Sequence, residues 1–419
     1  YPEVTMKELL NFLETSYTAY QATENARACL LQNGFTELSE QEPWTLTDGG
    51  KYFVTRGGSA LIAFCVGDAA QGFKIAASHT DSPALKLKSS PSLSDAHDTR
   101  LNTEAYGGGL YYSYFDRPLR IAGRVIRERG SALVSEPYAS DFLVTLPSLA
   151  IHLNRDANTG FAPDKQADLP LLCLGAREFA DIVRDAVDFD LYAACAEKPY
   201  LWGADGEFLS APRIDNLASV CASLKALAEG GTGMRVVACL DGEEVGSLTR
   251  QGADSDFLSA TLTRITAAQG LDAQGHSLAL SRSFCLSLDG AQGFHPNHPE
   301  KYDPQERAYL GKGAALKRHA GGAYTTDALS AAAVRKLFAL ADAPLQSFYN
   351  RSNMRSGGTL GAISLSHVTV LTADIGIPQL AMHSAVETMA CSDYAALVAG
   401  LRSFFAREIC VRHGQIEIK

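Results

Sequence analysis

The latter part of the chain alternates short apolar runs with longer segments of helical periodicity. The runs MRVVACL (234–240) and SFCLSLD (283–289) have the length and composition of buried strands. Apolar side chains recur at helical spacing over 215–231, 327–341 and 392–408. Strands that alternate with helices are typical of a mainly parallel sheet covered by helices on both faces. The pattern therefore predicts an α/β fold, in which ligands bind at the carboxyl ends of strands.

The first 88 residues continue this pattern. Apolar residues between Leu9 and Leu13 indicate a helix, and 52–67 reads as a β-hairpin around a glycine pair. The short apolar strand FKIAAS (73–78) leads directly to His79. These elements are predicted to belong to the same α/β domain.

Two helix ends carry residues typical of caps. The segment 24–35 is helical in pattern, with Gly34 as its expected C-terminal stop. For the helix over 392–408, either Ser392 or Asp393 is expected to serve as the N-cap.

Between residues 89 and 209 the composition changes. Polar loops such as SSPSLSDAHDTR, the glycine cluster YGGGLYYSYF and several β-like runs replace the alternation of strands and helices. We interpret this stretch as a β-rich domain inserted into the α/β domain, which would then consist of 1–88 and 210–419. Two structural units also suit a length of 419 residues.

Composition excludes several classes of protein. No apolar stretch approaches the length of a membrane span, so no membrane association is expected. A net charge of −10 argues against a nucleic-acid partner, which would require a basic face. It also offers no general attraction for acidic ligands, so any acidic specificity would need a local cation.

The nine cysteines are scattered, odd in number and without CxxC pairs. Reduced thiols that act as small buried hydrophobic residues explain this pattern better than a disulfide framework. The opening residues carry no basic and apolar segments of the secretory type. We therefore expect a cytoplasmic protein.

Polar residues suited to metal binding or proton transfer follow several predicted strands or precede a helix. They are His79, Asp81, Asp215, Glu243, Glu244, Asp289 and His383. One histidine and one carboxylate at a strand end is common, but several at the same edge of one sheet are not. Adjacent buried carboxylates such as the two glutamates also require a positive partner.

A pair of divalent metal ions would supply that partner. Imidazole and carboxylate suit zinc, and manganese and cobalt also accept them. Two ions about 4 Å apart need a bridging carboxylate and a terminal pair of ligands each, so two histidines and three carboxylates suffice. Asp81 and one glutamate of the Glu243–Glu244 pair then remain. Their expected tasks are to hold the His79 ring and to act as general base toward a metal-bound water.

At this point the sequence resembles the aspartyl aminopeptidases, the M18 family of zinc peptidases. The resemblance covers nearly the whole chain, in the order SHTDSPALKLK, YGGGLYYSYFDRPLRIAGRV, LAIHLNR, PRIDNLAS, DGEEVGS and QLAMHSAVE. It implies a catalytic α/β domain interrupted by a β-rich dimerisation domain that can also act as a lid. It further implies a cytosolic homo-oligomer, a tetrahedral dodecamer built from dimers.

The resemblance also implies two zinc ions per subunit and a role for each residue of the cluster. His79 and Asp289 would hold one ion, Glu244 and His383 the other, and Asp215 would bridge them. Glu243 would be the general base for a metal-bridging hydroxide, and Asp81 would orient His79.

Two further residues match family positions outside the ligand set. His152, in LAIHLNR of the inserted segment, would stabilise the oxyanion in the active site of a neighbouring subunit. Lys317 would bind the acidic side chain of peptides that begin with Asp or Glu. The alternatives are an ordinary surface or interface histidine at 152 and a solvated lysine at 317.

The chain departs from the family in places, notably at Gly290 and Gln292 and in the RHAGGAYTTD segment beside Lys317. The second departure puts the acidic specificity in doubt more than the hydrolysis. A neutral aminopeptidase, a dipeptidase or an amide deacylase with the same metals therefore stays open. So does an assembly or cargo-binding protein with vestigial catalysis.

Overall fold

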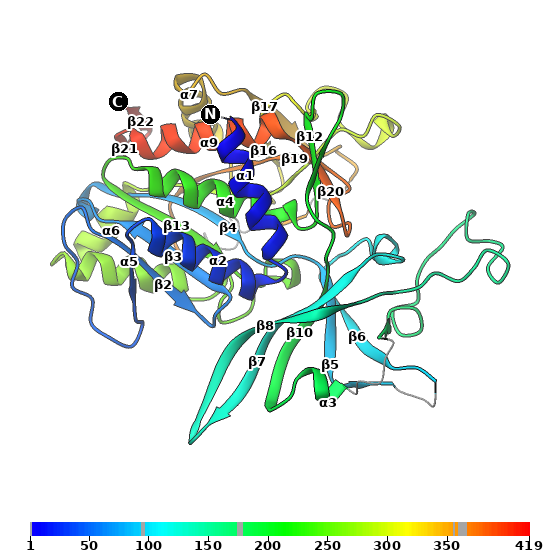
Figure 1. Cartoon of the computed structure of the whole chain (residues 1–419). Helices are drawn as coiled ribbons and strands as arrows, with labels where there is room; N and C mark the ends of the chain where they lie inside the picture. Colours follow the sequence, from blue (N-terminus) through cyan, green and yellow to red (C-terminus); the bar gives the residue numbers. More distant parts are fainter. Residues whose placement is uncertain (1, 94–96, 174–178, 355–356, 359–366) are drawn as a thin grey trace.

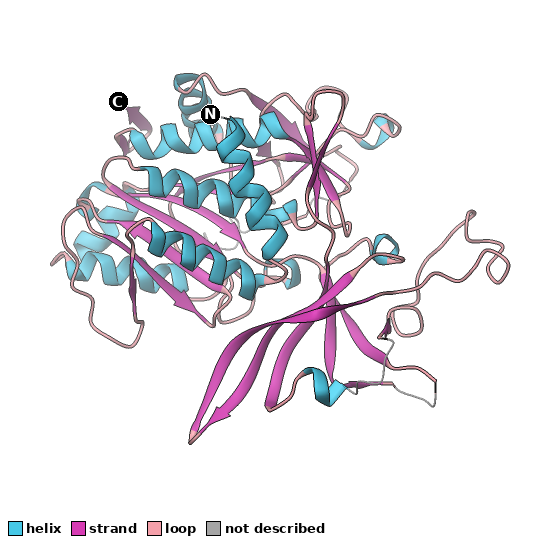
Figure 2. Cartoon of the chain, in the orientation of Figure 1, coloured by secondary structure: helices cyan, strands magenta, loops and turns pink. Residues whose placement is uncertain are grey.

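The structure is a computed structural model and describes residues 2–93, 97–173, 179–354, 357–358 and 367–419. Figure 1 shows a part in which helices cover a sheet and, beside it, a second part made almost entirely of strands. The same division is visible by secondary structure in Figure 2.

A nine-stranded sheet forms the centre of the helix-covered part. In spatial order its strands are β1 (Thr36–Leu38), β2 (Lys51–Arg56), β3 (Ala60–Cys65), β13 (Met234–Leu240), β4 (Phe73–His79), β14 (Phe284–Leu288), β18 (Leu371–Gly376), β16 (Ala314–Arg318) and β17 (Leu345–Tyr349). The central strands β13, β4, β14 and β18 run parallel, while β2 and β3 form the predicted antiparallel hairpin. The predicted α/β fold is confirmed.

Helices cover both faces of this sheet. One face carries α1 (Pro2–Thr15), α2 (Ala19–Gln32), α4 (Ile214–Glu229), α7 (Ala328–Leu340) and α9 (Cys391–Ala406). The other face carries α5 (Phe257–Ala268) and α6 (Ala273–Ser281). Successive strand residues point to opposite faces, so Val237 packs in the first core and its neighbour Ala238 in the second.

The strand-only part is a six-stranded antiparallel sheet with its own hydrophobic core. Its strands are β8 (Ala132–Val144), β7 (Leu119–Arg129), β10 (Ala186–Cys195), β5 (Ala84–Ser92), β6 (Arg100–Tyr106) and β9 (Leu171–Leu172), and α3 (Phe179–Ile182) packs into the same core. The inserted-domain boundaries at 89 and 209 stay a prediction.

A five-stranded sheet lies next to the nine-stranded one and carries part of the candidate site. Its order is β11 (Tyr200–Trp202), β12 (Phe208–Ala211), β20 (Glu387–Ala390), β19 (Pro378–Leu380) and β15 (Ala291–Gln292). The remaining elements are the hairpin β21 (Ile409–Arg412) and β22 (Gln415–Ile418) and the 3₁₀ turns η1 (Ala69–Gln71), η2 (Tyr111–Tyr114), η3 (Glu243–Val245) and η4 (Pro299–Lys301).

Two local expectations about helix ends are corrected. The helix α2 begins at Ala19, earlier than predicted, because the Thr18 side chain accepts a hydrogen bond from the N–H of Tyr20 and caps it. The helix α9 has Ala390 at its N-cap position, without a side-chain cap. Asp393 lies inside the first turn, where a contact with a distant loop engages its carboxylate.

The cysteine prediction holds for most positions but not for all. Cys29 is exposed, and Cys391 and Cys410 are half-buried, so these three are not the small core residues that the sequence predicted. The other six are buried, and all nine are free thiols. Among the helices of the described residues, none has both the length and the apolar character needed to cross a bilayer.

Candidate metal centre

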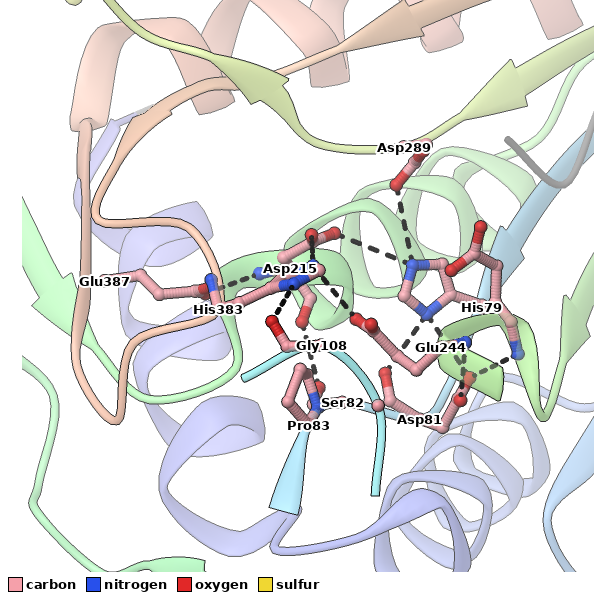
Figure 3. A network of polar contacts seen from close by, with 12 residues as sticks. His79, Asp81, Ser82, Pro83, Gly108, Asp215, Glu244, Asp289, His383 and Glu387 are labelled. Atoms are coloured by element: carbon pink, nitrogen blue, oxygen red, sulfur yellow. Dashed lines mark hydrogen bonds and ion pairs between the residues drawn. The ribbon is translucent and has the colours of Figure 1, made fainter. Parts of the chain in front are cut away.

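The candidate site lies where the parallel central strands end (Figure 3). His79 is the last residue of β4, Glu243 and Glu244 begin η3 shortly after the end of β13 at Leu240, and Asp289 directly follows β14. Because β13, β4 and β14 are neighbours in the sheet, their carboxyl ends bring these side chains to one edge. This is the edge at which the sequence predicted a site.

Two further residues approach this edge from other elements. Asp215 lies at the start of α4, and His383 follows β19 in the five-stranded sheet. We refer to the residues gathered here as the ligand cluster: His79, Asp81, Asp215, Glu243, Glu244, Asp289 and His383. All seven were predicted as site residues, and the structure brings them together.

Asp215 stands between the two histidines. The Nε2 atom of His79 lies 3.6 Å from Asp215 Oδ1 and 3.5 Å from Asp289 Oδ1. The Nε2 atom of His383 lies 3.3 Å from Asp215 Oδ2 and 3.2 Å from Glu244 Oε1. Each carboxylate oxygen of Asp215 thus faces a different histidine, which is the geometry of a shared ligand.

The second ring nitrogen of each histidine is directed at an oxygen atom. His383 Nδ1 is 3.2 Å from the carbonyl oxygen of Gly108, and His79 Nδ1 is 3.1 Å from the carbonyl oxygen of Asp81. The Asp81 carboxylate lies slightly farther from the His79 ring, at 3.4 Å. A proton on Nδ1 that is donated to these oxygens leaves Nε2 free as a ligand atom.

Asp81 also holds the loop that carries both glutamates. Its Oδ1 accepts the backbone N–H of Glu243 and its Oδ2 that of Glu244, each at 3.1 Å. The hydroxyl of Tyr106 donates to Oδ2 at 2.8 Å. Asp81, predicted to orient His79, is therefore placed to fix the glutamate pair as well.

The residues present fit a divalent metal. Three overlapping groups of the described residues each bring ligand atoms within 4.8 Å of one another: His79 with Glu243 and Glu244, His79 with Asp215 and Asp289, and Asp215 with Glu244 and His383. Asp215 Oδ1 and Glu244 Oε1 are buried and accept no hydrogen bond from the described residues. A cation would satisfy both oxygens, and the imidazole and carboxylate donors suit zinc.

Carboxylates surround the two histidines of the cluster and raise the pKa of each imidazole. Burial alone would lower the pKa of His383, but Asp215 and Glu244 outweigh it and raise that pKa to about 10. The pKa of His79 is raised well above its ordinary value by Asp215, Asp289 and Asp81, against the effect of burial. The neighbouring carboxylates thus favour a positive charge on both imidazoles, as they would favour a bound cation.

The two neighbouring glutamates have raised pKa values. Burial is the main cause at Glu243, where the pKa rises to about 7, with nearby carboxylates adding to the effect and His79 opposing it. Burial likewise raises the pKa of Glu244 well above its ordinary value. A carboxyl with a pKa near neutrality beside a ligand group has the property that a general base requires.

Lys317 is buried beside the cluster. Only 1% of the residue is exposed, which contradicts the alternative of a solvated lysine. Its Nζ lies 3.3 Å from Asp289 Oδ2, 3.2 Å from the carbonyl oxygen of Asp289 and 3.0 Å from that of Gly290. It also lies 5.0 Å from the centre of the Tyr324 ring. These contacts engage its ammonium group with Asp289, a member of the ligand cluster.

His152 lies outside this arrangement. It is exposed in a turn between β8 and β9, in a segment that extends away from the rest of the chain in Figure 1. No hydrogen bond or ion pair joins it to the ligand cluster within the described part of the chain. Its neighbours Leu149, Ile151 and Leu153 are exposed apolar residues, at 63%, 48% and 75%.

Sequence reasoning missed three contributors to the site: Glu387, Tyr106 and the glycine cluster. Glu387 is buried and accepts the backbone N–H groups of Asp215 and His383. Gly107 has a φ of +74°, and a Cβ atom there would lie 3.1 Å from Cβ of Glu244. A carboxylate four residues after His383 was the available signal for Glu387, and the glycine run signalled close backbone approach.

An α/β sheet with buried histidines and carboxylates at the carboxyl ends of its strands is typical of metal-dependent hydrolases. Comparison with known families is more specific. Residues 12–178 and 168–405 match the family described as aminopeptidase I zinc metalloprotease (M18). The chain belongs to this family of zinc metallo-aminopeptidases, and the resemblance predicted from the motifs is confirmed.

Curated relatives and solved structures agree with this assignment. The chain is 40% identical over 423 residues to a probable M18 family aminopeptidase 2 of Clostridium acetobutylicum, covering 95% of this chain and 98% of the relative. A corresponding protein of Stutzerimonas stutzeri is 36% identical, with 95% and 97% covered.

Two solved structures illustrate the fold. The aligned chain of the Ape4 and Nbr1 complex has a TM-score of 0.92 and 32% identity, with 96% of this chain and 86% of that chain covered. The S. cerevisiae mApe1 dodecamer has a TM-score of 0.82 and 25% identity, with 97% of both chains covered.

Proposed function

We propose that this metallo-aminopeptidase removes N-terminal aspartate or glutamate from peptides with two divalent metal ions, zinc in the first place, in its ligand cluster. The observation that carries the two-ion proposal is the position of Asp215. Its oxygens lie 3.6 Å from His79 Nε2 and 3.3 Å from His383 Nε2, so two ligand groups share one carboxylate. A shared carboxylate is what a two-metal site requires. Manganese and cobalt are the alternatives to zinc.

Two of the three groups support the ligand roles that the family resemblance implies. His79 and Asp289 would hold one ion, Glu244 and His383 the other, and Asp215 both. Bound there, the ions would polarise the scissile carbonyl and lower the pKa of a water molecule to about 7.

Proton transfer is assigned to Glu243. Its carboxylate would take a proton from the attacking water and return it to the leaving amine. Asp81 supports this role, since its hydrogen bond to the Glu243 backbone fixes the position of that residue.

The acidic preference is assigned to Lys317. As a cation beside the Asp289 ligand, it would favour a substrate whose side chain carries negative charge. A charge-assisted contact of about 1.5–3 kcal/mol corresponds to a roughly ten- to hundredfold preference. This assignment requires that the substrate carboxylate compete with the present contacts of the ammonium group.

A second candidate is an aminopeptidase with neutral specificity. The observation that favours it is that Asp289 and Gly290 already engage the Lys317 ammonium group with three oxygens. In this alternative Lys317 serves to hold the metal ligand, and the side-chain pocket selects by shape.

We further propose that the protein acts in the cytoplasm as a tetrahedral dodecamer built from dimers. The dodecameric mApe1 structure and the exposed apolar residues on both sides of His152 support this assembly. In it, those residues would be covered by a neighbouring subunit, and His152 would reach that subunit's site to stabilise the oxyanion. Nine free thiols suit a reducing compartment.

The experiment that tests this function measures initial rates on anilides of Asp, Glu, Leu and Ala, after chelation and after return of Zn, Mn or Co. Metal-restored activity that favours Asp and Glu supports the proposal. Metal-restored activity that favours Leu or Ala supports the neutral alternative. No activity with any metal on folded protein would favour a binding role with vestigial catalysis.

A further inference from the structure

Glu387 joins two ligand residues that come from separate parts of the chain. It is the first residue of β20, and only 2% of it is exposed. Its Oε2 accepts the backbone N–H of Asp215 at 2.8 Å, and its Oε1 accepts that of His383 at 2.6 Å. One carboxylate therefore fixes the separation of two backbone positions that lie 168 residues apart in the sequence (383 − 215).

These two residues belong to the same ligand group. Asp215, Glu244 and His383 bring their ligand atoms within 4.8 Å of one another. His383 has a φ of +66°, a left-handed conformation that is unfavourable for a residue other than glycine. The hydrogen bond from its N–H to Glu387 is placed to maintain that conformation, and with it the direction of the imidazole.

No lysine or arginine in the described residues forms an ion pair with Glu387. A buried carboxylate without a cation is costly unless hydrogen bonds satisfy it. The two ligand N–H groups satisfy it, and Figure 3 shows Glu387 behind His383, on the side away from the other histidine. The arrangement thus gives Glu387 a role toward the ligands and none as half of a salt bridge.

We propose that Glu387 is a positioning residue that sets the metal affinity of the group formed by Asp215, Glu244 and His383. It does so by holding the backbones of two of these ligands at the required separation before the metal arrives. This inference rests on the proposed function, because it requires that a metal ion binds to this group.

The same device occurs on the other side of the cluster. Asp81 accepts the N–H groups of Glu243 and Glu244, as Glu387 accepts those of Asp215 and His383. Four residues of the ligand cluster are therefore positioned through their backbones by two buried carboxylates. Residues that orient ligands from behind in this way contribute about 10- to 100-fold to metal affinity in other proteins.

The test compares Glu387→Gln with a matched control, Asp393→Asn. Glutamine keeps the shape of the side chain but can accept only one of the two N–H groups, since its amide nitrogen is a donor. Asp393 is also buried and accepts two backbone N–H groups, those of Gly311 and Gly313, but neither is a ligand. Each variant loses a buried carboxylate that accepts two backbone N–H groups, but only in Glu387→Gln do those N–H groups belong to the ligand cluster.

Metal affinity is measured on chelated, full-length protein by Co²⁺ titration, followed by visible absorption and by competition with a chelator. We expect Glu387→Gln to weaken one binding step about 10- to 100-fold and Asp393→Asn to change neither step by more than about twofold. An unchanged affinity in Glu387→Gln overturns the proposal. An equal loss in both variants also overturns it, because the effect would then come from general loosening of the fold.

A measurement on the wild-type chain covers the case in which Glu387→Gln does not fold. The amide hydrogens of Asp215 and His383 should exchange slowly with solvent in the chelated protein, since Glu387 accepts both. Fast exchange of either amide would overturn the proposed pre-positioning. A wild-type chain that binds no Co²⁺ at all would instead refute the metal site itself, and with it the proposed function.

Discussion

The ligand cluster is assembled within one chain, whereas the proposed role of the segment that carries His152 requires a second chain. The ligand cluster draws on the ends of parallel strands, a helix start and the five-stranded sheet, and two buried carboxylates hold its backbones in place. The segment between β8 and β9 consists of turns and irregular stretches, exposes Leu149, Ile151 and Leu153, and extends from the six-stranded sheet.

This difference separates metal binding from the further steps of the reaction. The histidines and carboxylates of the cluster are already within reach of one another, so one folded chain can bind metal. The proposed oxyanion donor His152 is not within that reach, and its role requires a second copy of the chain. Metal affinity and turnover should therefore respond to different substitutions.

The largest effect is expected for Glu243→Gln. Removal of the general base should lower kcat by about 10³-fold or more, while the metal content stays near that of the wild-type chain. Rates on the best anilide substrate and elemental analysis of the same sample check this. A matching loss of metal would show that Glu243 is a ligand, as its place in a group with His79 and Glu244 also allows.

A loss of about 100-fold in kcat is expected for His152→Ala, with unchanged metal content, because one oxyanion donor is removed. The sharper test is complementation between subunits. Coexpressed His152→Ala and Glu243→Gln chains should form mixed assemblies in which some sites have both groups, so activity should exceed that of either variant alone. Additive residual rates would place His152 in its own subunit's site or outside catalysis.

The strand-end part of the cluster could be predicted because apolar runs mark where each strand stops, and parallel strands stop at one edge. The contributions of Glu387 and Gly108 were missed because their partners lie far away in the chain: the Glu387 carboxylate accepts the backbone N–H of Asp215, and the backbone carbonyl oxygen of Gly108 contacts His383, and every residue type carries such backbone groups. Asp393 shows the opposite failure. Its local position suggested an N-cap, but the N–H groups of Gly311 and Gly313, distant in sequence, engage its carboxylate.

Lys317 combines both cases: its presence near the site was predicted from the sequence, but its surroundings were not. Its motif identified a lysine near the site, but its burial and its contacts with Asp289 depend on the strand order, which places β16 beside β18 and one strand away from β14. No residue pattern along the chain contains that information. A substitution at Lys317 can therefore distinguish a role in substrate selection from a role in holding Asp289.

For Lys317→Met we expect the ratio of kcat/KM for Asp- over Leu-anilide to fall about tenfold, because the cation that favours an acidic side chain is lost. Any effect on Asp289 and its metal lowers both rates and cancels in the ratio. If both rates fell while the ratio stayed constant, Lys317 would serve the ligand alone, and the neutral specificity would be supported.

The smallest expected effect concerns protons and metal at His383. In the metal-free chain, burial lowers the pKa of His383, but Asp215 and Glu244 outweigh it and raise that pKa to about 10. A raised pKa in the folded state stabilises the fold fully below the unfolded value of about 6.5. This contribution is lost as the pH rises from about 6.5 to about 10. The melting temperature of chelated protein should therefore fall by a few °C over that range.

Metal-loaded protein should lose less stability over the same range, because a metal on Nε2 replaces the proton there. The increase in melting temperature on adding metal should thus grow with pH. A chelated His383→Gln variant is the control and should show a weaker pH dependence than the chelated wild-type chain. If the melting temperatures of loaded and chelated wild-type protein fell equally with pH, metal and proton would not compete for this imidazole.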